Sequence, residues 1–315
     1  MVIDIEEVFA ALPNEAYWKL LIDYEYWVDN DASIFDKQDS PGYMNRASKA
    51  FLYLLETMDE RVTCDFILKL HDMAYNDQRK HYLGFKPHVL SGLSDESVTV
   101  DGLRELINKI KSGMPNGLRL TYSKEANNYH ERYAIDLQHV CAQEIFTNLN
   151  SDVWPHLFIE RKSLVTEVEL EVENLLIQYN ESIRQAIAPK EKLKCIATLI
   201  RDLHQYHPFG DGNGRTFIFL LLNKLLITNG LSATAVESPQ RFSGYSISEL
   251  ITEIELGQCN FRELCTQQYE KQISLQEYIR QKISPQNYMG HLRIFKESVL
   301  EQGETAPLKH RAFSS

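Results

Sequence analysis

Two apolar segments with helical periodicity flank a short glycine-rich loop, and this arrangement limits the possible fold more than any other feature. The first segment begins near Pro189 and ends at Tyr206, with apolar residues every three or four positions, and the second is apolar through Thr216–Leu226. Such repeats favour helices that bury one face. The intervening stretch, His207–Arg215, predicts a tight turn. We therefore expect a helix–loop–helix unit at the centre of a mainly helical protein.

Three side chains of the loop can act on a phosphate group or on an attacking hydroxyl. His207 is a base whose ordinary pKa of about 6.5 lets it exchange a proton near neutral pH. Asp211 offers the hard anionic oxygen that Mg²⁺ prefers, and Arg215 is a planar cation that can bind two phosphate oxygens. A base, a metal ligand and a cation at this spacing indicate phosphoryl or nucleotidyl transfer.

The backbone of the loop is suited to binding an anion. Gly212 and Gly214 are expected to adopt positive φ angles and to let the main chain approach a ligand closely. Their N–H groups, with Asn213, would lie at the start of the next helix. Unpaired amides and the positive end of the helix dipole meet there, so we expect a phosphate site.

Three simpler loop types fit these residues less well. An EF-hand would need oxygen ligands at its fifth and twelfth positions, where this chain has Arg215 and Leu222. A Walker A loop would end in Gly-Lys-Ser/Thr, which does not follow here. An ordinary turn accounts for any one of these residues, but the full set between two apolar helices favours a functional site.

The loop resembles the motif of the Fic family, His-x-Phe-x-Asp/Glu-Gly-Asn-Gly-Arg-x-x-Arg. His207–Arg215 matches every motif position but the last, where this chain has Ile218 in place of the second Arg. The resemblance implies that Phe209 anchors the loop in the core. The replaced Arg leaves open how the far end of a phosphate chain would be held.

The resemblance also implies a fold: an all-α, Fic-type helical bundle with a small β-hairpin flap. The flap is expected near residues 80–101, where Val98 and Val100 give a short alternation. Residues 1–62 would form an N-terminal helical region and residues 63–270 the Fic core. Within the core, residues 113–160 are expected to be an insertion that adds packing. Residues 271–315 would form a helical or disordered tail.

The activity implied by the resemblance is that of a protein AMPylase. ATP or another nucleoside triphosphate would be the donor, with Mg²⁺ held by Asp211 and with Asn213 and Arg215 stabilising the developing charge. His207 would take the proton from a Tyr, Thr or Ser hydroxyl of a target protein that docks at the flap. The residues expected to bind the nucleotide are Gly210, Gly212, Asn213, Gly214, Arg215 and, at the base, Tyr245.

Two alternatives remain open at this point. Some Fic proteins bind the donor in the reverse sense and transfer phosphocholine or phosphate, and the loss of the second Arg at Ile218 suits such a donor. The chain could also be a non-catalytic nucleotide-binding or interaction module, although an intact His207 and Asp211 fit this poorly.

The inhibitory helix of many Fic proteins is not found. Residues 163–187 predict a long helix. Within it, Glu173 and Asn174 match only the last two positions of the inhibitory pattern, Ser/Thr-x-x-x-Glu-Gly/Asn. Its first position is Glu169 rather than Ser or Thr. In the family the inhibitory Glu pairs with the second Arg of the motif. Because both are missing, we expect this form of regulation to be lost.

Composition bounds the partners and the location. The net charge of −11 argues against nucleic-acid binding. The apolar run Phe217–Ile227 is interrupted by Asn223 and Lys224, and it is too short for a transmembrane segment.

The five cysteines include no Cys-x-x-Cys pair, which favours reduced thiols and a cytoplasmic protein. The first residues lack a basic region followed by an apolar run, so we expect no signal peptide. The acidic stretch Glu297–Glu304 resembles the tails of bacterial type IV effectors. It raises the alternative of secretion into a host cell.

Overall fold

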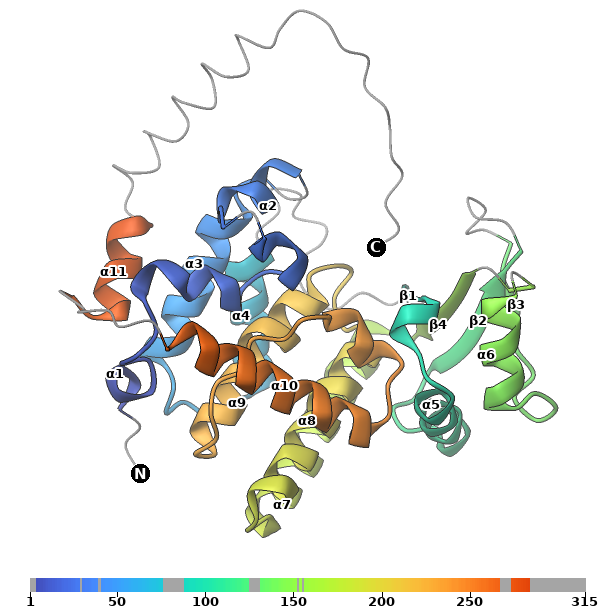
Figure 1. The fold of residues 1–315 in the computed structure, drawn as a ribbon. Coiled ribbons are helices and arrows are strands. Elements are labelled where there is room, and N and C mark those ends of the chain that lie inside the picture. Colours follow the sequence, from blue (N-terminus) through green and yellow to red (C-terminus); the bar gives the residue numbers. More distant parts are fainter. Residues whose placement is uncertain are drawn as a thin grey trace, which may run out of the picture.

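The protein is seen in a computed structural model that describes residues 4–28, 30–38, 41–75, 88–124, 131–151, 153–154, 156–266 and 273–283. Most of these residues are helical, and a small sheet lies at one side of the helical body (Figure 1). The helical character predicted from the sequence is confirmed. The tail beyond residue 283 and the segment 76–87 lie outside the described residues.

The N-terminal region is helical but divided into short pieces. Its elements are α1 (Ile5–Val8), η1 (Asn14–Leu20), η2 (Tyr24–Trp27), α2 (Ser33–Gln38) and α3 (Tyr43–Glu56), of which η1 and η2 are 3₁₀ helices. Pro13 precedes η1, and its ring keeps that position out of a continuous helix. Aromatic side chains fill this region: Phe9 lies edge-on to Phe51, and Phe35 lies 4.7 Å from Tyr43 between ring centres. The region packs on the core, since α3 packs against α4 (Cys64–Tyr75).

The centre of the helical body is α8 (Pro189–Tyr206), which packs against its neighbours α7, α9 and α10. Residues Leu203–Tyr206 are all buried, so the end of this helix is enclosed on every side. After the loop the chain enters η4 (Arg215–Leu221), whose turns have π-helical winding, and continues into α9. The bounds of the other core helices are α7 (Val165–Gln185), α9 (Leu222–Thr228), η5 (Pro239–Ser243), α10 (Ile247–Leu264) and α11 (Leu275–Lys282).

The expectation of an all-α fold with only a β-hairpin is corrected by a four-stranded antiparallel sheet. Its strands are β1 (His88–Leu93), β2 (Leu118–Ser123), β3 (Tyr133–Ala134) and β4 (His156–Lys162), in the order β1-β4-β2-β3. The strand β1 pairs with β4 along its whole length, with Leu90 opposite Glu160. Among residues 88–101 there is therefore no hairpin, because the partner of β1 lies about seventy residues later. The remainder of the expected flap, residues 80–87, lies outside the described residues.

Residues 113–160, the expected insertion, contain most of the sheet. They supply β2, β3, most of β4 and helix α6 (Ala142–Asn150). Together with β1, the 3₁₀ turn η3 (Asp95–Ser97) and helix α5 (Val100–Ser112), they form the unit at the right of Figure 1. In this unit α5 packs on α6, and Leu120, Leu157 and Ile159 of the strands are nearly inaccessible.

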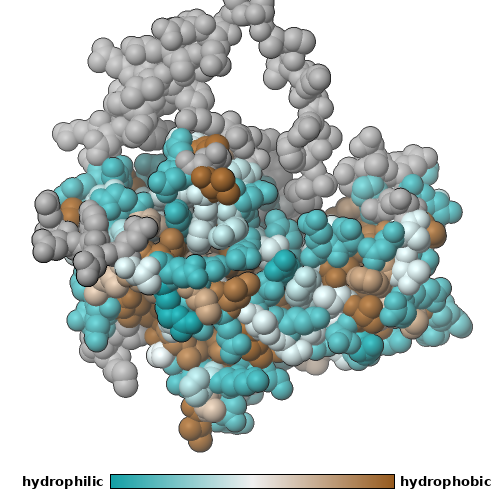
Figure 2. Space-filling model, viewed as in Figure 1, coloured by the Kyte–Doolittle hydropathy of each residue, from teal (hydrophilic) through white to brown (hydrophobic). Residues whose placement is uncertain are grey.

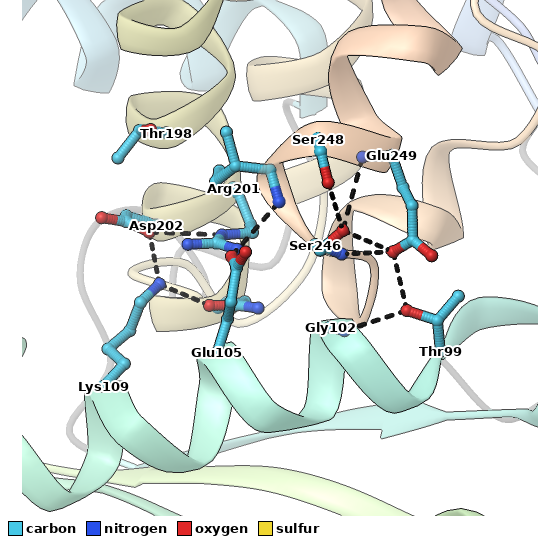
Figure 3. Close-up of polar contacts among 12 residues, drawn as sticks. Thr99, Gly102, Glu105, Lys109, Thr198, Arg201, Asp202, Ser246, Ser248 and Glu249 are labelled. Carbon is cyan, nitrogen blue, oxygen red and sulfur yellow. Dashed lines mark hydrogen bonds and ion pairs between the residues drawn. The ribbon is translucent and has the colours of Figure 1, made fainter.

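A partly buried charged cluster joins this unit to the helix that ends at the loop (Figure 3). Lys109 of α5 bonds Asp202 and, at 2.5 Å, the amide oxygen of Gln205 on α8. Arg201 of α8 binds Glu105 of α5. Because opposite charges and hydrogen bonds satisfy each other here, the two helices can bury these groups together.

The start of α5 lies directly against the segment that leads into α10. A side chain at Gly102 would place its Cβ 1.9 Å from the carbonyl oxygen of Gly244, so only glycine fits this contact. The Thr99 N–H donates to the same carbonyl at 3.2 Å, and the Thr99 hydroxyl donates to Glu249 at 2.7 Å (Figure 3). The sheet unit is thus attached to the core at two helices, α8 and α10.

Hydrophilic and hydrophobic residues are interspersed over the face drawn in Figure 2. Within the described part of the chain, no helix combines the length and the apolar character that a bilayer crossing requires. The five cysteines all lie in that part and remain reduced thiols, as their sequence spacing predicts.

Candidate active site

His207 stands at the point where α8 ends. Its backbone angles, φ 49° and ψ 62°, are left-handed, which is uncommon for a residue other than glycine. A conformation of this kind costs about 1–3 kcal/mol and persists only where the surroundings hold it. The His207 N–H still donates to the Leu203 carbonyl at 3.1 Å, so the residue closes the last turn of the helix.

The geometry around the His207 ring defines its protonation state. Nδ1 bonds the carbonyl oxygen of His204, and a carbonyl can only accept, so Nδ1 carries the proton. In the neutral ring Nε2 is then the nitrogen that can accept a proton. The pKa of His207 is lowered to about 4, mainly by burial and also by the cation of Arg161, against the opposing effects of the His204 carbonyl and Asp211. The ring is therefore neutral at pH 7, as a general base must be.

Asp211 is exposed at the tip of the loop, where both of its carboxylate oxygens are engaged. Oδ1 accepts from the N–H of Gly212 at 2.6 Å, and Oδ2 accepts from the hydroxyl of Tyr75 at 2.6 Å. Each oxygen keeps a lone pair for a metal ion, because a carboxylate oxygen has two. One of the N–H groups expected to bind phosphate, that of Gly212, is used within the loop itself.

His71 of α4 packs against the loop. Its Nε2 donates to the Asp211 carbonyl oxygen at 2.9 Å, and its ring stacks on Phe209 with 3.7 Å between ring centres. Burial lowers the pKa of His71 to about 4, so this ring is also neutral. Phe209 is fully buried and contacts Phe217 on its other side, which confirms it as the apolar anchor of the loop.

Gly212 and Gly214 differ in conformation. Gly212 has φ 75°, and a Cβ there would lie 3.0 Å from the Tyr75 ring, so this position requires glycine on two grounds. Gly214 has φ −58° and belongs to the first helical turn, which corrects the expectation of a positive φ. The helix has already begun at Gly214, since the Thr216 N–H donates to the Gly212 carbonyl at 3.0 Å.

Asn213 binds the loop rather than facing away from it. Its Nδ2 donates to the Phe209 carbonyl at 3.0 Å, and its Oδ1 accepts from the Phe209 N–H at 3.2 Å. With 2% of its surface exposed, the amide is committed to the main chain. A direct role of Asn213 in stabilising charge stays a prediction.

Arg215 extends over three aromatic rings from the N-terminal part of the chain. Its guanidinium carbon lies 4.7 Å from the ring centre of Tyr43, 5.5 Å from Phe35 and 5.7 Å from Tyr75. Such rings attract a cation and restrict the plane of the guanidinium. The N-terminal region therefore shapes the site.

Two other predicted positions lie in different settings. Ile218, where the motif would have its second Arg, is fully buried in the core. Tyr245 precedes α10, and its ring lies 5.6 Å from the guanidinium of Arg241. Its contact with a nucleotide base, like that of Gly210 with phosphate, stays a prediction.

Three residues beside the loop were missed from the sequence: His71, Tyr75 and Arg161. His71 and Tyr75 are four residues apart on one face of an amphipathic helix, a weak signal that only the packing of α4 on the loop makes meaningful. Arg161 is an arginine at an inward-facing position of β4, in step with Leu157 and Ile159. Once β4 is known to be a buried strand, a charged residue in this position indicates a specific contact.

No protein-family model matches the chain. Over 287 residues the chain is 24% identical to the phosphocholine transferase AnkX of Legionella pneumophila, a match that covers 83% of this chain. The residues outside the matched span are too few to extend from either end of the chain to the loop. The matched span therefore extends across positions 207–215. It covers 29% of AnkX, so the chain spans less than a third of that relative's length.

The similarity to a transferase agrees with the resemblance carried by the loop, and the mainly helical structure is consistent with a Fic-like fold. The relative is a phosphocholine transferase, and nothing in the match supports AMP transfer in particular.

Proposed function

We propose that the chain transfers a phosphate-linked group from a nucleotide donor to a hydroxyl group of a protein, with His207 as the general base. The observation that carries this proposal is the His207 ring: neutral, with Nδ1–H on the His204 carbonyl and with Nε2 as the proton acceptor. It is joined in one loop by an exposed carboxylate, Asp211, and by the cation Arg215.

The reaction balances with these groups. The hydroxyl oxygen of the target attacks the phosphorus and forms a new P–O bond, while its proton passes to Nε2 of His207. The bond from phosphorus to the leaving phosphate oxygen breaks, and the electron pair departs with the leaving group. Arg215 and the N–H groups at the start of the helix would stabilise the developing charge.

Asp211 fits a role in holding Mg²⁺. Its carboxylate is exposed, is fixed by Tyr75 and Gly212, and retains lone pairs. Within the described residues no group of three or more His, Cys, Asp or Glu side chains could hold a metal ion. One carboxylate with substrate phosphates and water is a common arrangement for Mg²⁺. A bound ion would neutralise charge on the phosphates.

The donor to be tested first is CDP-choline, so that phosphocholine is transferred and CMP leaves. Two observations support this choice. The relative that matches 83% of the chain is a phosphocholine transferase. The residue at 218 is a fully buried isoleucine, which offers no cation to the far phosphate of a triphosphate.

Transfer of AMP from ATP, with pyrophosphate leaving, is the second candidate. It is favoured by the loop, since His207–Arg215 keeps every position of the Fic motif except the last. The two candidates use the same base and differ in the group transferred.

The target would dock beside β1. In the described sheet β1 is an edge strand, paired only with β4, and an edge strand offers N–H and C=O groups to an added strand. The predicted docking near residues 80–101 therefore keeps a physical basis in residues 88–93. Delivery of the chain into a host cell, where such a target would be found, stays a prediction.

The decisive experiment is intact-mass analysis of cell-lysate proteins, and of the chain itself, after incubation with Mg²⁺ and one donor at a time. CDP-choline, ATP and the other nucleoside triphosphates form the panel, and His207→Ala is the control. The mass added identifies the group. If no donor adds mass, while calorimetry shows Mg²⁺-dependent nucleotide binding, the chain is a binding module and the proposal fails.

A further inference from the structure

Arg161 occupies a position in β4 where an apolar side chain would be expected. It alternates with Leu157 and Ile159 on one face of the strand, and each of the three is 1% exposed. Charged side chains are almost never buried to this extent unless they bind a partner. The contacts of Arg161 therefore account for its presence in the core.

The guanidinium of Arg161 binds the end of α8. Nε donates to the Tyr206 carbonyl at 2.9 Å, and Nη2 donates to the His207 carbonyl at 3.1 Å. The guanidinium also lies 5.2 Å from the centre of the Tyr206 ring. The last carbonyls of a helix have no partner within the helix, and a cation is favourable beside them.

The carbonyl that Arg161 holds belongs to the residue with the unusual backbone. His207 is left-handed at φ 49°, and its Nδ1 bonds the His204 carbonyl in this conformation. Two hydrogen bonds from one planar group fix the carbonyls of residues 206 and 207 relative to each other. Release of these carbonyls would free the His207 ring to turn.

We propose that Arg161 is a positioning residue for His207: by binding the carbonyls of Tyr206 and His207, it keeps Nδ1–H of His207 on the His204 carbonyl and Nε2 directed to the substrate. The importance of this for catalysis rests on the function proposed above. Arg161 is carried by the sheet, so the sheet unit is part of the catalytic apparatus.

The test uses Arg161→Lys and Arg161→Met, with Arg119→Lys as the matched control. Arg119 lies in the same sheet and binds Glu160 at 2.8 Å. Glu160 precedes Arg161 in β4, so its side chain lies on the other face of the strand. Arg161→Lys keeps the positive charge but replaces the planar guanidinium with a single ammonium group. Because the charge is kept, we expect this variant to fold even if Arg161→Met does not. Circular dichroism and thermal unfolding select the variants that are folded.

The first readout is the tautomer of His207, measured by ¹⁵N–¹H correlation spectra of the imidazole at pH 7 and assigned with His207→Ala. We expect Nδ1–H in the wild type and in Arg119→Lys. In Arg161→Met we expect a mixture with Nε2–H, and in Arg161→Lys a smaller change. The second readout is group transfer: kcat falls up to about a hundredfold in Arg161→Met and less in Arg161→Lys, while the KM for the donor is unchanged.

A folded Arg161 variant that keeps both the Nδ1–H tautomer and the wild-type kcat overturns the proposal. A general loss of stability without a change in tautomer also overturns it, because a structural role alone would give that result. The tautomer measurement needs no substrate. If the wild type transfers no group but the tautomer changes in the Arg161 variants, the proposed function fails and the positioning role of Arg161 stands.

Discussion

The hydroxyl of Tyr75 donates a hydrogen bond of 2.6 Å to Oδ2 of Asp211, and this contact joins α4 to the candidate active-site loop. The second oxygen of Asp211 accepts from the Gly212 N–H, so the carboxylate is held at both ends. A carboxylate fixed in this way loses little freedom when it binds a metal ion. Partners of this kind commonly contribute tenfold to hundredfold in metal affinity or activity.

Tyr75→Phe removes this hydrogen bond and keeps the ring beside Gly212 and Arg215. We expect the Mg²⁺ concentration for half-maximal transfer to rise about tenfold or more, with little change in thermal stability. Tyr179→Phe is the matched control, since the Tyr179 hydroxyl accepts from Asn229 at the C-terminal end of α9 instead. Identical Mg²⁺ titrations for Tyr75→Phe and wild type would exclude a role of the Tyr75 hydroxyl in Mg²⁺ binding.

His207→Ala should lower transfer by about a hundredfold or more, because general-base catalysis contributes on that scale. Donor binding should remain, since the base acts on the incoming hydroxyl. Rapid-quench transfer assays and calorimetry with the same donor measure the two effects. His139→Ala is the control, because His139 is exposed and its ring bonds Asp136, three residues away on the surface. Full activity in His207→Ala would contradict the role of the base.

The buried imidazoles predict a loss of stability in acid. Burial lowers the pKa of His71 from 6.5 to about 4 in the folded protein. Between these values the unfolded chain binds more protons than the folded one, so stability is full above pH 6.5 and falls as the pH drops toward 4.

His71→Gln can test this, because the amide still donates to the Asp211 carbonyl but does not titrate. Between pH 7 and pH 5 the wild type should lose about 2 kcal/mol more than the variant in urea unfolding. His139→Gln, a change at the surface, should follow the wild type. Equal losses in wild type and His71→Gln would show that His71 titrates normally in the fold.

The loop could be predicted from the sequence because its chemistry is contiguous. His207, Asp211 and Arg215 all lie in one short loop, so their spacing alone keeps them near one another. The long helix expected at 163–187 is also confirmed, as α7 spans Val165–Gln185, because its apolar stripe repeats over many turns. A pattern contained within one segment of the sequence can be recognised without knowing the fold.

What escaped prediction depends on contacts between distant segments. The partner of β1 is β4, and β4 does not alternate, since five of its consecutive residues are buried. Arg161 has meaning only once β4 lies beside the end of α8. In the same way, His71 and Tyr75 join the site through the packing of α4, which no local pattern of residues indicates.

Asn213 allows a last prediction that separates two roles. If its amide acts by closing the loop on Phe209, then Asn213→Ala leaves a buried N–H and C=O without partners and destabilises the protein by about 1–3 kcal/mol. Donor binding should weaken with it, because the loop that presents the N–H groups is no longer fixed. If the amide instead touches the developing charge, kcat falls while stability and donor binding are kept. Urea unfolding and donor calorimetry on Asn213→Ala and Asn213→Asp decide between them. The two hydrogen bonds to Phe209 and the 2% exposure of Asn213 favour the first outcome.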